Sequence, residues 1–429
     1  MANLSEISRA VESLDLDQVV VRINELVSID TTIPPGEHYA DLIEVVSPYL
    51  ENIGFSLEIV QVPEELVQQI PFALHGPRPN LVATKDFGQK DTITFYGHMD
   101  VVPAPNEGSE KWRTNPYEAV LKGKRIFGRG VADMKGFIAI VILALELMHQ
   151  QAFTPQYNIR VVVCTDEEVG VQPGVSYLAK QGYIEGTVFC GDGPIWDKYV
   201  VGAPGLLVAE IETIGKTCHA GMNFLGVNAV DAMIPILDEL LVLKQDVEAR
   251  RSQVPGVPRT ETPDERFMSP MFNMDVIRGG EKFNIVPPSC KLTIDRRVIP
   301  EESLEVVERE ILDAVERGRS RSVAIDVRVA FHHAFFPLFI DPTTPAAMRM
   351  QAVIKAVNTM GERTLDPIAM PASTDMGFLS EILDTHDILL RGVANVSSNT
   401  HGVNETISVK DVYVLIKEIL LFLCGDIYQ

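Results

Sequence analysis

The sequence predicts an α/β protein in which helices cover both faces of a mostly parallel sheet, with a smaller α+β module inserted into it. Apolar strand and helix patterns alternate along the first part of the chain, which is typical of parallel sheets. After Val201 the pattern changes to several strands with only two helices. The chain has 429 residues, too many for one ordinary domain. Two domains are therefore expected, one of them interrupted by the other.

Each element of the first domain follows from its local pattern. Apolar residues at helical spacing over Asp15–Ile53, interrupted by the Pro/Gly segment Thr32–Gly36, predict two helices around a loop. The β-branched and aromatic run Thr92–Tyr96 predicts a buried strand. Phe137–Gln150 then predicts an apolar helix, and Asn158–Cys164 predicts the strand that follows it.

The inserted module has its own order of elements. It contains strand and helix patterns at Leu206–Ile214, Gly226–Val242, Phe272–Ile277, Cys290–Ile294, Ser303–Val315 and Val323–Ala330. Apolar helices resume at Pro345–Val357 and Asp411–Cys424, so the last part of the chain is expected to return to the first domain. The predicted division is a larger domain of residues 1–203 and 332–429 and an inserted smaller domain of residues 204–331.

Composition and charge limit the classes of function. The apolar fraction of 46% and the charged fraction of 22% are typical of soluble globular proteins. A net charge of −22 argues against nucleic acid or a membrane surface as partner. No secretory signal is visible, and the most apolar stretches, Gly136–Met148 and Val412–Leu423, are too short to span a membrane. Five scattered cysteines without a CxxC pair predict buried free thiols in a reducing compartment, so we expect a cytoplasmic protein.

Side chains of the metal-ligand type follow several predicted strands. His98 and Asp100 come directly after one of them, at the edge of an α/β sheet where ligands bind. Because a carboxylate beside a ligating imidazole fixes its tautomer, Asp100 is a candidate orienting group for His98. A polar loop after a strand is the alternative interpretation. Asp192 follows the apolar segment Thr187–Cys190, and His401 lies in a polar loop before the last helix.

Three further acidic residues each allow two interpretations. Asp133 precedes an apolar helix, where it is either an N-cap, worth about 1 kcal/mol, or a carboxylate that bridges two metal ions. By itself the N-cap is the better interpretation. Glu167 and Glu168 follow a strand, and adjacent acids usually form a solvated loop. In a metal hydrolase one of them holds metal while the other transfers protons. As a set, the two imidazoles and the carboxylates supply what a two-zinc hydrolytic site requires.

Motifs around these residues run in a fixed order along the chain. They are Gly97-His98-Met99-Asp100-Val101-Val102-Pro103, Trp112, Pro116, Gly128-Arg129-Gly130-Val131-Ala132-Asp133-Met134-Lys135-Gly136, Thr165-Asp166-Glu167-Glu168-Val169-Gly170, and His401 in a His-x-x-Asn-Glu run. In order and spacing they resemble the co-catalytic zinc aminoacylase and carboxypeptidase family. That family includes acetylornithine deacetylase, succinyl-diaminopimelate desuccinylase and glutamate carboxypeptidase.

The resemblance implies a role for each candidate residue. It implies five ligands for two divalent ions: the bridging Asp133, His98 and Asp192 on one ion, and Glu168 and His401 on the other. Glu167 would be the general base and acid, and Asp100 the orienting carboxylate. Zinc is the expected metal, with cobalt or manganese as alternatives.

The inserted module resembles the lid and dimerisation domain of that family. His219 lies in a segment that matches the one whose histidine stabilises an oxyanion, often across a dimer; an ordinary loop histidine is the alternative. Asn284 and one of two neighbouring arginines match residues that hold a substrate carboxylate, a task that suits a planar guanidinium. Arg297 is assigned this role, with Arg296 left open. Thr374 lies in a partial match to the substrate loop. A homodimer and a small carboxylate-bearing substrate are therefore implied.

Three segments depart from the family pattern. Gly193 separates Asp192 from Pro194, Arg391–Asn395 stands where the family has a Gly-Pro pair, and Pro371–Asp375 matches only in part. We expect these changes to line the substrate pocket more than the metal shell.

The sequence therefore predicts a metal-dependent hydrolase that cleaves a C–N bond in an N-acyl amino acid or a dipeptide-like amide, with Glu167 as general base. One alternative keeps the site but changes the reaction to hydrolytic deamination of an activated amino-aromatic acid such as 5-nitroanthranilate. A single manganese ion would suffice for that reaction. A second alternative is a metal-holding binding protein without turnover, although binding alone does not need the spare Glu167.

Overall fold

A computed structural model describes residues 2–70, 73–106, 108, 110–170, 173–195, 198–256, 266–359 and 365–427 of the chain. The chain divides into two units. The first contains the residues up to Val200, Ile340–Pro367 and the residues from Phe378 onward. The second contains Val201–Phe339 and Ile368–Gly377. The segment Ile368–Gly377, which the sequence placed in the first domain, thus belongs to the second unit.

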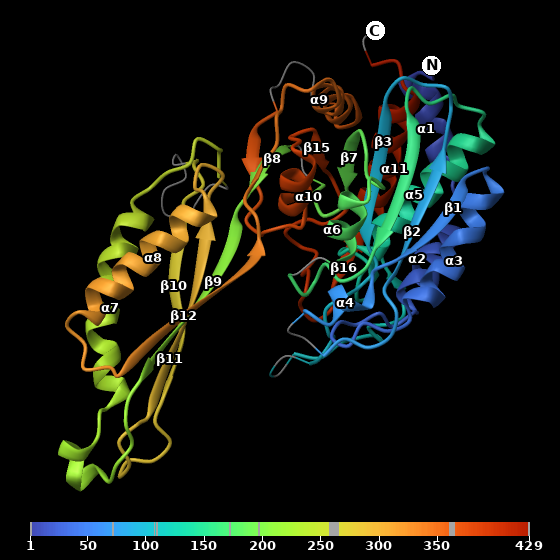
Figure 1. Ribbon diagram of the computed structural model, residues 1–429. Coiled ribbons are helices and arrows are strands. Elements are labelled where there is room, and N and C mark those ends of the chain that lie inside the picture. The colour runs from blue at the N-terminus through green and yellow to red at the C-terminus, as the bar shows by residue number, and fades with distance from the viewer. Residues whose placement is uncertain are drawn as a thin grey trace. The chain divides into compact units, whose positions relative to one another are not determined.

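The first unit is built on a six-stranded sheet (Figure 1). In sheet order its strands are β1 (Ser56–Gln61), β2 (Pro79–Lys85), β6 (Asn158–Cys164), β3 (Thr92–His98), β7 (Thr187–Cys190) and β15 (Ile388–Leu390). The last four are parallel neighbours, whereas β1 and β2 add antiparallel pairing at one edge. The central strands are rich in Val, Ile and Phe because both of their faces are buried.

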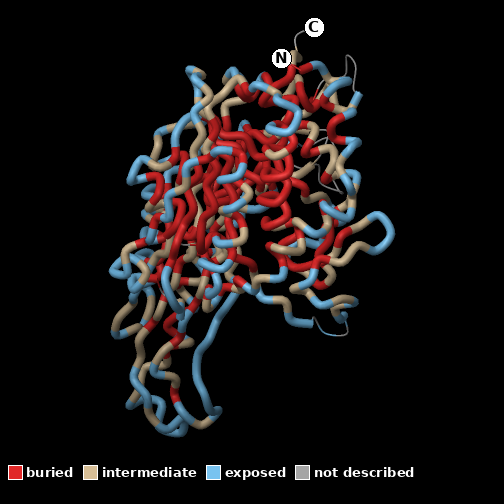
Figure 2. Tube along the Cα trace, turned by 90° about the vertical axis from the view of Figure 1, so that its right-hand side faces the viewer, coloured by how far each residue is buried: buried red, intermediate tan, exposed pale blue. Residues whose placement is uncertain are grey.

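Helix α5 (Lys135–Gln150) lies at the centre of the first unit. Almost all of its residues are buried, and it packs against β3, α2 and α11. The other helices of this unit include α1 (Leu4–Glu12), α2 (Leu16–Val27), α3 (Tyr39–Asn52), α4 (Glu64–Val67), α6 (Pro173–Lys180), α9 (Pro345–Val357) and α11 (Val409–Cys424). Buried residues form a continuous interior with exposed residues around it (Figure 2).

The second unit is a four-stranded antiparallel sheet with two helices packed on it. In sheet order the strands are β10 (Met271–Gly279), β11 (Ser289–Val298), β9 (Gly205–Ile214) and β12 (Asp326–Phe335). Alternate residues of β9 and β11 are buried beneath α7 (Ala229–Glu248) and α8 (Leu304–Arg319), and they form one apolar cluster with them. A 3₁₀ helix, η1 (Ala220–Leu225), precedes α7. The other face of the sheet is less buried and carries polar side chains such as Glu210, Glu212 and Lys291 beside apolar ones.

Smaller elements complete the chain. They are β4 (Val120–Lys122), β5 (Arg125–Phe127) and β16 (Thr406–Ser408) in one three-stranded sheet, β8 (Tyr199–Ala203), β13 (Leu338–Phe339) and β14 (Pro367–Ala369) in another, and α10 (Met376–Leu383). The predicted fold class is confirmed: a mainly parallel six-stranded sheet is accompanied by a separate antiparallel sheet with two helices.

Two sequence expectations concern the chain as a whole. All five cysteines are free, and four are buried as expected, but Cys218 is partly exposed because it lies in the loop before η1. Within the described ranges, no helix has the length and apolar character that crossing a membrane requires.

Candidate metal centre

His98 is the last residue of β3, and its side chain is almost fully buried. Its Nε2 lies 3.0 Å from Oδ1 of Asp133. Its Nδ1 lies 3.1 Å from the backbone oxygen of Asp100 and 3.5 Å from Oδ1 of the same residue. The other carboxylate oxygen of Asp100 accepts a hydrogen bond from the backbone N–H of Glu168 at 2.9 Å. Asp100 therefore fixes both the imidazole of His98 and the segment after β6.

The Asp133 carboxylate lies between two imidazoles. One oxygen is 3.0 Å from Nε2 of His98, and the other is 3.0 Å from Nε2 of His401. The N-cap of α5 is Met134 and not Asp133, and no side chain caps this helix start. The N-cap interpretation of Asp133 is therefore wrong, because its carboxylate serves the histidines instead. The peptide bond between Asp133 and Met134 is cis.

A buried ion pair holds the Asp133 loop in place. Nη1 of Arg129 lies 2.6 Å from Oε2 of Glu405, and both side chains are almost fully buried. The second oxygen of Glu405 accepts hydrogen bonds from the backbone N–H groups of Ala132 at 2.8 Å and Asp133 at 3.3 Å. Nη2 of Arg129 donates to the backbone oxygen of His401 at 2.9 Å. The pair thus ties together the two loops whose side chains meet at Asp133.

Glu168 completes the group on the turn after β6. Its carboxylate oxygens lie 3.1 Å from Nε2 of His401. One ligand atom from each of His98, Asp133 and Glu168 falls within 4.8 Å of the others. Glu167, the predicted general base, belongs to the same turn and is largely buried.

The turn that carries the two glutamates is anchored by a network that the sequence did not predict. Asp166 is fully buried and has a positive φ of 64°. Its Oδ2 lies 3.0 Å from Nε of Arg78, and its Oδ1 accepts a hydrogen bond from the Tyr39 hydroxyl at 2.8 Å. Burial, followed by the charge of Asp100, raises the pKa of Asp166 to about 7. Neither Arg78 nor Tyr39 lies in a motif, so only the fold places them here.

The candidate ligands shift one another's pKa values. Hydrogen bonds to Asp133 and Glu168 raise the pKa of His401 to about 10. Burial disfavours charge on His98, but hydrogen bonds to Asp100 and Asp133 outweigh it and raise the pKa well above its usual value. Burial opposes charge on Asp133 too, yet hydrogen bonds from both histidines lower its pKa. Burial, followed by the charge of Asp133, raises the pKa of Glu168 to about 7.

The donor set fits divalent metal ions. Imidazole nitrogens with carboxylate oxygens are zinc ligands, and ligation requires neutral imidazoles and ionised carboxylates. A divalent cation at this position would offset the buried negative charge of Asp133 and Glu168. Oδ1 of Asp100 is buried 3.5 Å from Nδ1 of His98, where it can accept from the Nδ1–H of a ligating imidazole.

Asp192 occupies the end of the neighbouring strand. Cys190 of β7 pairs with Tyr96 of β3, and the backbone N–H of Gly191 donates to the Tyr96 oxygen at 3.3 Å. Asp192 thus follows β7 at the same sheet edge at which His98 ends β3, and it is half-buried. Its role as the fifth ligand stays a prediction.

The second unit carries the remaining candidates. His219 is exposed at the start of η1, where its Nδ1 accepts a hydrogen bond from the backbone N–H of Gly221 at 3.1 Å. Asn284 lies beside it, because its backbone oxygen accepts from the N–H of Ala220 at 3.0 Å and Ile285 bridges to His219. Oδ1 of Asn284 is buried and has no hydrogen-bond partner. His219 and Asn284 therefore belong to one local cluster.

The neighbouring arginines of β11 differ in accessibility. Arg296 is fully buried on the helix side of the sheet and pairs with Glu302 at 2.6 Å. Arg297 lies on the opposite side and forms two hydrogen bonds to the Asp295 carboxylate, at 2.9 and 3.0 Å. It also donates to the Ser373 hydroxyl at 3.2 Å, next to the fully buried Thr374. Of the two arginines, Arg297 is the one whose side chain reaches solvent.

Comparisons with known proteins agree with this geometry. The model of Peptidase family M20/M25/M40 matches residues 94–424. A probable succinyl-diaminopimelate desuccinylase of Staphylococcus aureus (strain MRSA252) is 24% identical over 364 residues, covering 79% of this chain and 83% of that protein. The N-formyl-4-amino-5-aminomethyl-2-methylpyrimidine deformylase of Halalkalibacterium halodurans is 25% identical over 451 aligned positions, covering 99% and 98%.

The fold comparison gives the same result. The crystal structure of Sso-CP2, an M20 family metallo-carboxypeptidase from Sulfolobus solfataricus, has a TM-score of 0.71 at 19% identity. The superposition covers 95% of this chain and 98% of that one. With the family model matching most of the chain, the protein belongs to Peptidase family M20/M25/M40 and is a metal-dependent hydrolase of the peptidase and amidohydrolase type.

Proposed function

We propose that this protein hydrolyses the amide bond of a small carboxylate-bearing substrate, such as an N-acyl amino acid or a dipeptide-like amide. The observation that carries the proposal is the Asp133 carboxylate placed between His98 and His401, with Glu168 against the second imidazole. Glu167, next in the chain to one of these groups, is the proposed proton carrier.

Two divalent ions, zinc being the expected metal, would be held by the bridging Asp133 together with His98, Asp192, Glu168 and His401. When bound, they supply Lewis-acid polarisation of the substrate carbonyl and acidify water. The side chains of the protein orient the proposed ligands and transfer protons. Asp100 orients His98, and the Arg129–Glu405 pair holds the Asp133 loop.

Glu167 performs the proton transfers in this proposal. It takes a proton from water as the C–O bond forms and returns it to the nitrogen as the C–N bond breaks, so the amine leaves neutral. Glu167 is largely buried and lies next to Glu168 on the turn after β6.

Two relatives support an acyl-removing activity. Their names, a desuccinylase and a deformylase, both describe removal of an acyl group, and the deformylase aligns with almost the whole chain. We propose that Arg297 binds the substrate carboxylate, in competition with Asp295. Asn284 and Thr374 are the other proposed contacts.

The test is a substrate panel with zinc-loaded protein. N-acetyl, N-succinyl and N-formyl amines, dipeptides and amino-aromatic acids are incubated with the enzyme, and released amine, carboxylic acid and ammonia are quantified separately. We expect amine and acid in equal amounts, with turnover abolished by chelation and restored by zinc. Release of ammonia from an amino-aromatic acid alone would replace the amidase proposal with deamination.

We further propose that the protein is a homodimer in which His219 stabilises the oxyanion across the interface. His219→Ala is then expected to lower kcat by roughly 10²- to 10³-fold without changing zinc content, because one preformed donor is lost. Kinetics, metal analysis and light scattering check this. A purely monomeric protein with full activity would rule out any contribution from a partner subunit.

A further inference from the structure

Two departures from the family pattern, Gly193 and Arg391–Asn395, meet in the structure. The segment after β7 and the segment after β15 run side by side: the N–H of Arg391 donates to the Cys190 oxygen at 3.0 Å, and that of Ile195 to the Ala394 oxygen at 2.8 Å. Asp192 lies between these two hydrogen bonds.

The contact between the two segments excludes side chains. A Cβ on Gly392 would lie 1.8 Å from the backbone oxygen of Gly191, and one on Gly193 would lie 2.2 Å from the carbonyl carbon of Leu390. Gly193 and Gly392 therefore allow this close packing, but neither provides a side chain that could anchor the Asp192 segment.

The Arg391 side chain supplies that anchor. Its guanidinium forms two hydrogen bonds to Glu418 of α11, Nε to Oε2 at 2.8 Å and Nη2 to Oε1 at 2.6 Å. Both side chains are almost completely buried. The remaining nitrogen, Nη1, donates to the backbone oxygens of Pro194 at 3.3 Å and Lys198 at 3.4 Å. One guanidinium thus connects the backbone of Pro194 and of Lys198 to Glu418 of the C-terminal helix.

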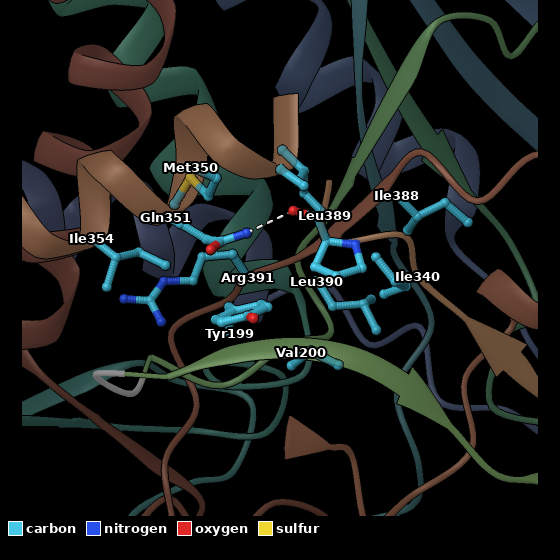
Figure 3. A pocket seen from close by; sticks show the side chains of 12 residues that line it. Tyr199, Val200, Ile340, Met350, Gln351, Ile354, Ile388, Leu389, Leu390 and Arg391 are labelled. Carbon is cyan, nitrogen blue, oxygen red and sulfur yellow. Dashed lines mark hydrogen bonds between the residues drawn. The ribbon is translucent and has the colours of Figure 1, made fainter. Parts of the chain in front are cut away.

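The surroundings keep this anchor rigid. Figure 3 shows the Arg391 side chain among Tyr199, Gln351 and Ile354, in a cavity of about 20 Å³ that has room for a single water molecule. The Arg391 side chain is 3% exposed, so packing as well as hydrogen bonds restrict the guanidinium. A lysine carries the same charge but lacks the planar fork that reaches a carboxylate and two carbonyls together.

We propose that the Arg391–Glu418 ion pair positions the Asp192 segment and thereby sets the affinity of the metal site to which Asp192 contributes. This inference rests on the proposed role of Asp192 as a ligand. Arg391 is a positioning residue that acts through the backbone of Pro194. Its loss is expected to weaken the binding of one of the two metal ions. Loss of a group that positions a metal ligand typically lowers the affinity for the metal by 10- to 100-fold.

Zinc titration calorimetry with the chelator-treated full-length protein tests the inference. Arg391→Met combined with Glu418→Leu removes both charges together, so no unpaired charge is left buried. We expect one zinc ion to bind as in the parent protein and the other roughly 10- to 100-fold more weakly. Arg349→Met is the matched control, since Arg349 is also buried and donates to the backbone oxygens of Phe422 and Gly425 at the end of α11. That variant should bind both ions normally.

The outcomes separate this inference from the proposed function. A folded double variant that binds both ions with parental affinity overturns the positioning role and leaves the function untouched. Asp192→Ala should lose the same ion; if it retains both, the ligand assignment is wrong and the inference falls with it. Should the double variant fail to fold, Arg391→Lys takes its place. If Arg391→Lys binds one zinc ion more weakly, the inference is supported; if it binds both ions with parental affinity, the inference is refuted.

Discussion

Glu167→Gln is expected to lower kcat by about 10²- to 10⁴-fold while both metal ions remain bound, because glutamine has the shape of glutamate but accepts no proton. KM should change little, since Glu167 is proposed to act on water and on the leaving nitrogen and not in substrate binding. Steady-state kinetics on the best substrate of the panel, together with metal analysis of the same preparation, measures both quantities.

The adjacent Glu168→Gln is the matched control, because it makes the same chemical change one residue further along the turn. Glu168 lies against His401, so its loss should weaken metal binding as well as activity. The pair of variants therefore separates proton transfer from ligation. If Glu167→Gln keeps full turnover, Glu167 is not the base; if it loses metal as Glu168→Gln does, it is a ligand.

The fold was predictable because each central element has a strong local pattern. The buried strands β3 and β6 and the apolar helix α5 are continuous apolar runs, and they appear where the sequence placed them. The antiparallel edge strand β1 was missed, since only one of its residues is buried and its pattern is correspondingly weak.

The resemblance pointed to four residues that lie together in the structure, but not to the residues that support them. His98, Asp133, Glu168 and His401 are neighbours in the structure, and their roles as ligands stay a prediction. Arg78, by contrast, lies just before β2 and far from Asp166 in sequence, and only tertiary packing brings the two together. An isolated arginine carries no signal of its partner.

The ambiguity between two neighbouring arginines shows what strand geometry adds to a motif. Successive residues of a strand point to opposite faces, so only one of Arg296 and Arg297 can face solvent. The sequence does not state which face α7 and α8 cover. Once the helices are placed over Arg296, its pairing with Glu302 follows, and Arg297 is left on the accessible face with Asp295.

Asp133→Asn is expected to have the largest effect of any single substitution, because the same carboxylate faces both imidazoles. Each oxygen of Asp133 lies 3.0 Å from one histidine nitrogen. An amide carries no charge and turns an N–H group toward one of these ligands, so both ions lose their shared donor. We expect both to dissociate during dialysis against micromolar zinc, and activity to fall by more than about 10⁴-fold, the range that loss of metal activation and general base catalysis implies together.

A true helix cap in the same chain provides the control for Asp133. Asp15 accepts a hydrogen bond from the N–H of Asp17 at the start of α2, and asparagine caps helices as well as aspartate does. Asp15→Asn should therefore leave metal content, kcat and Tm unchanged. If Asp133→Asn were equally silent, with two ions per chain by mass spectrometry, Asp133 would be a residue at a helix start and not the bridge between two metal sites. Loss of only one ion would show that Asp133 serves a single site, and the two-ion arrangement would have to be rebuilt around Glu168 and His401.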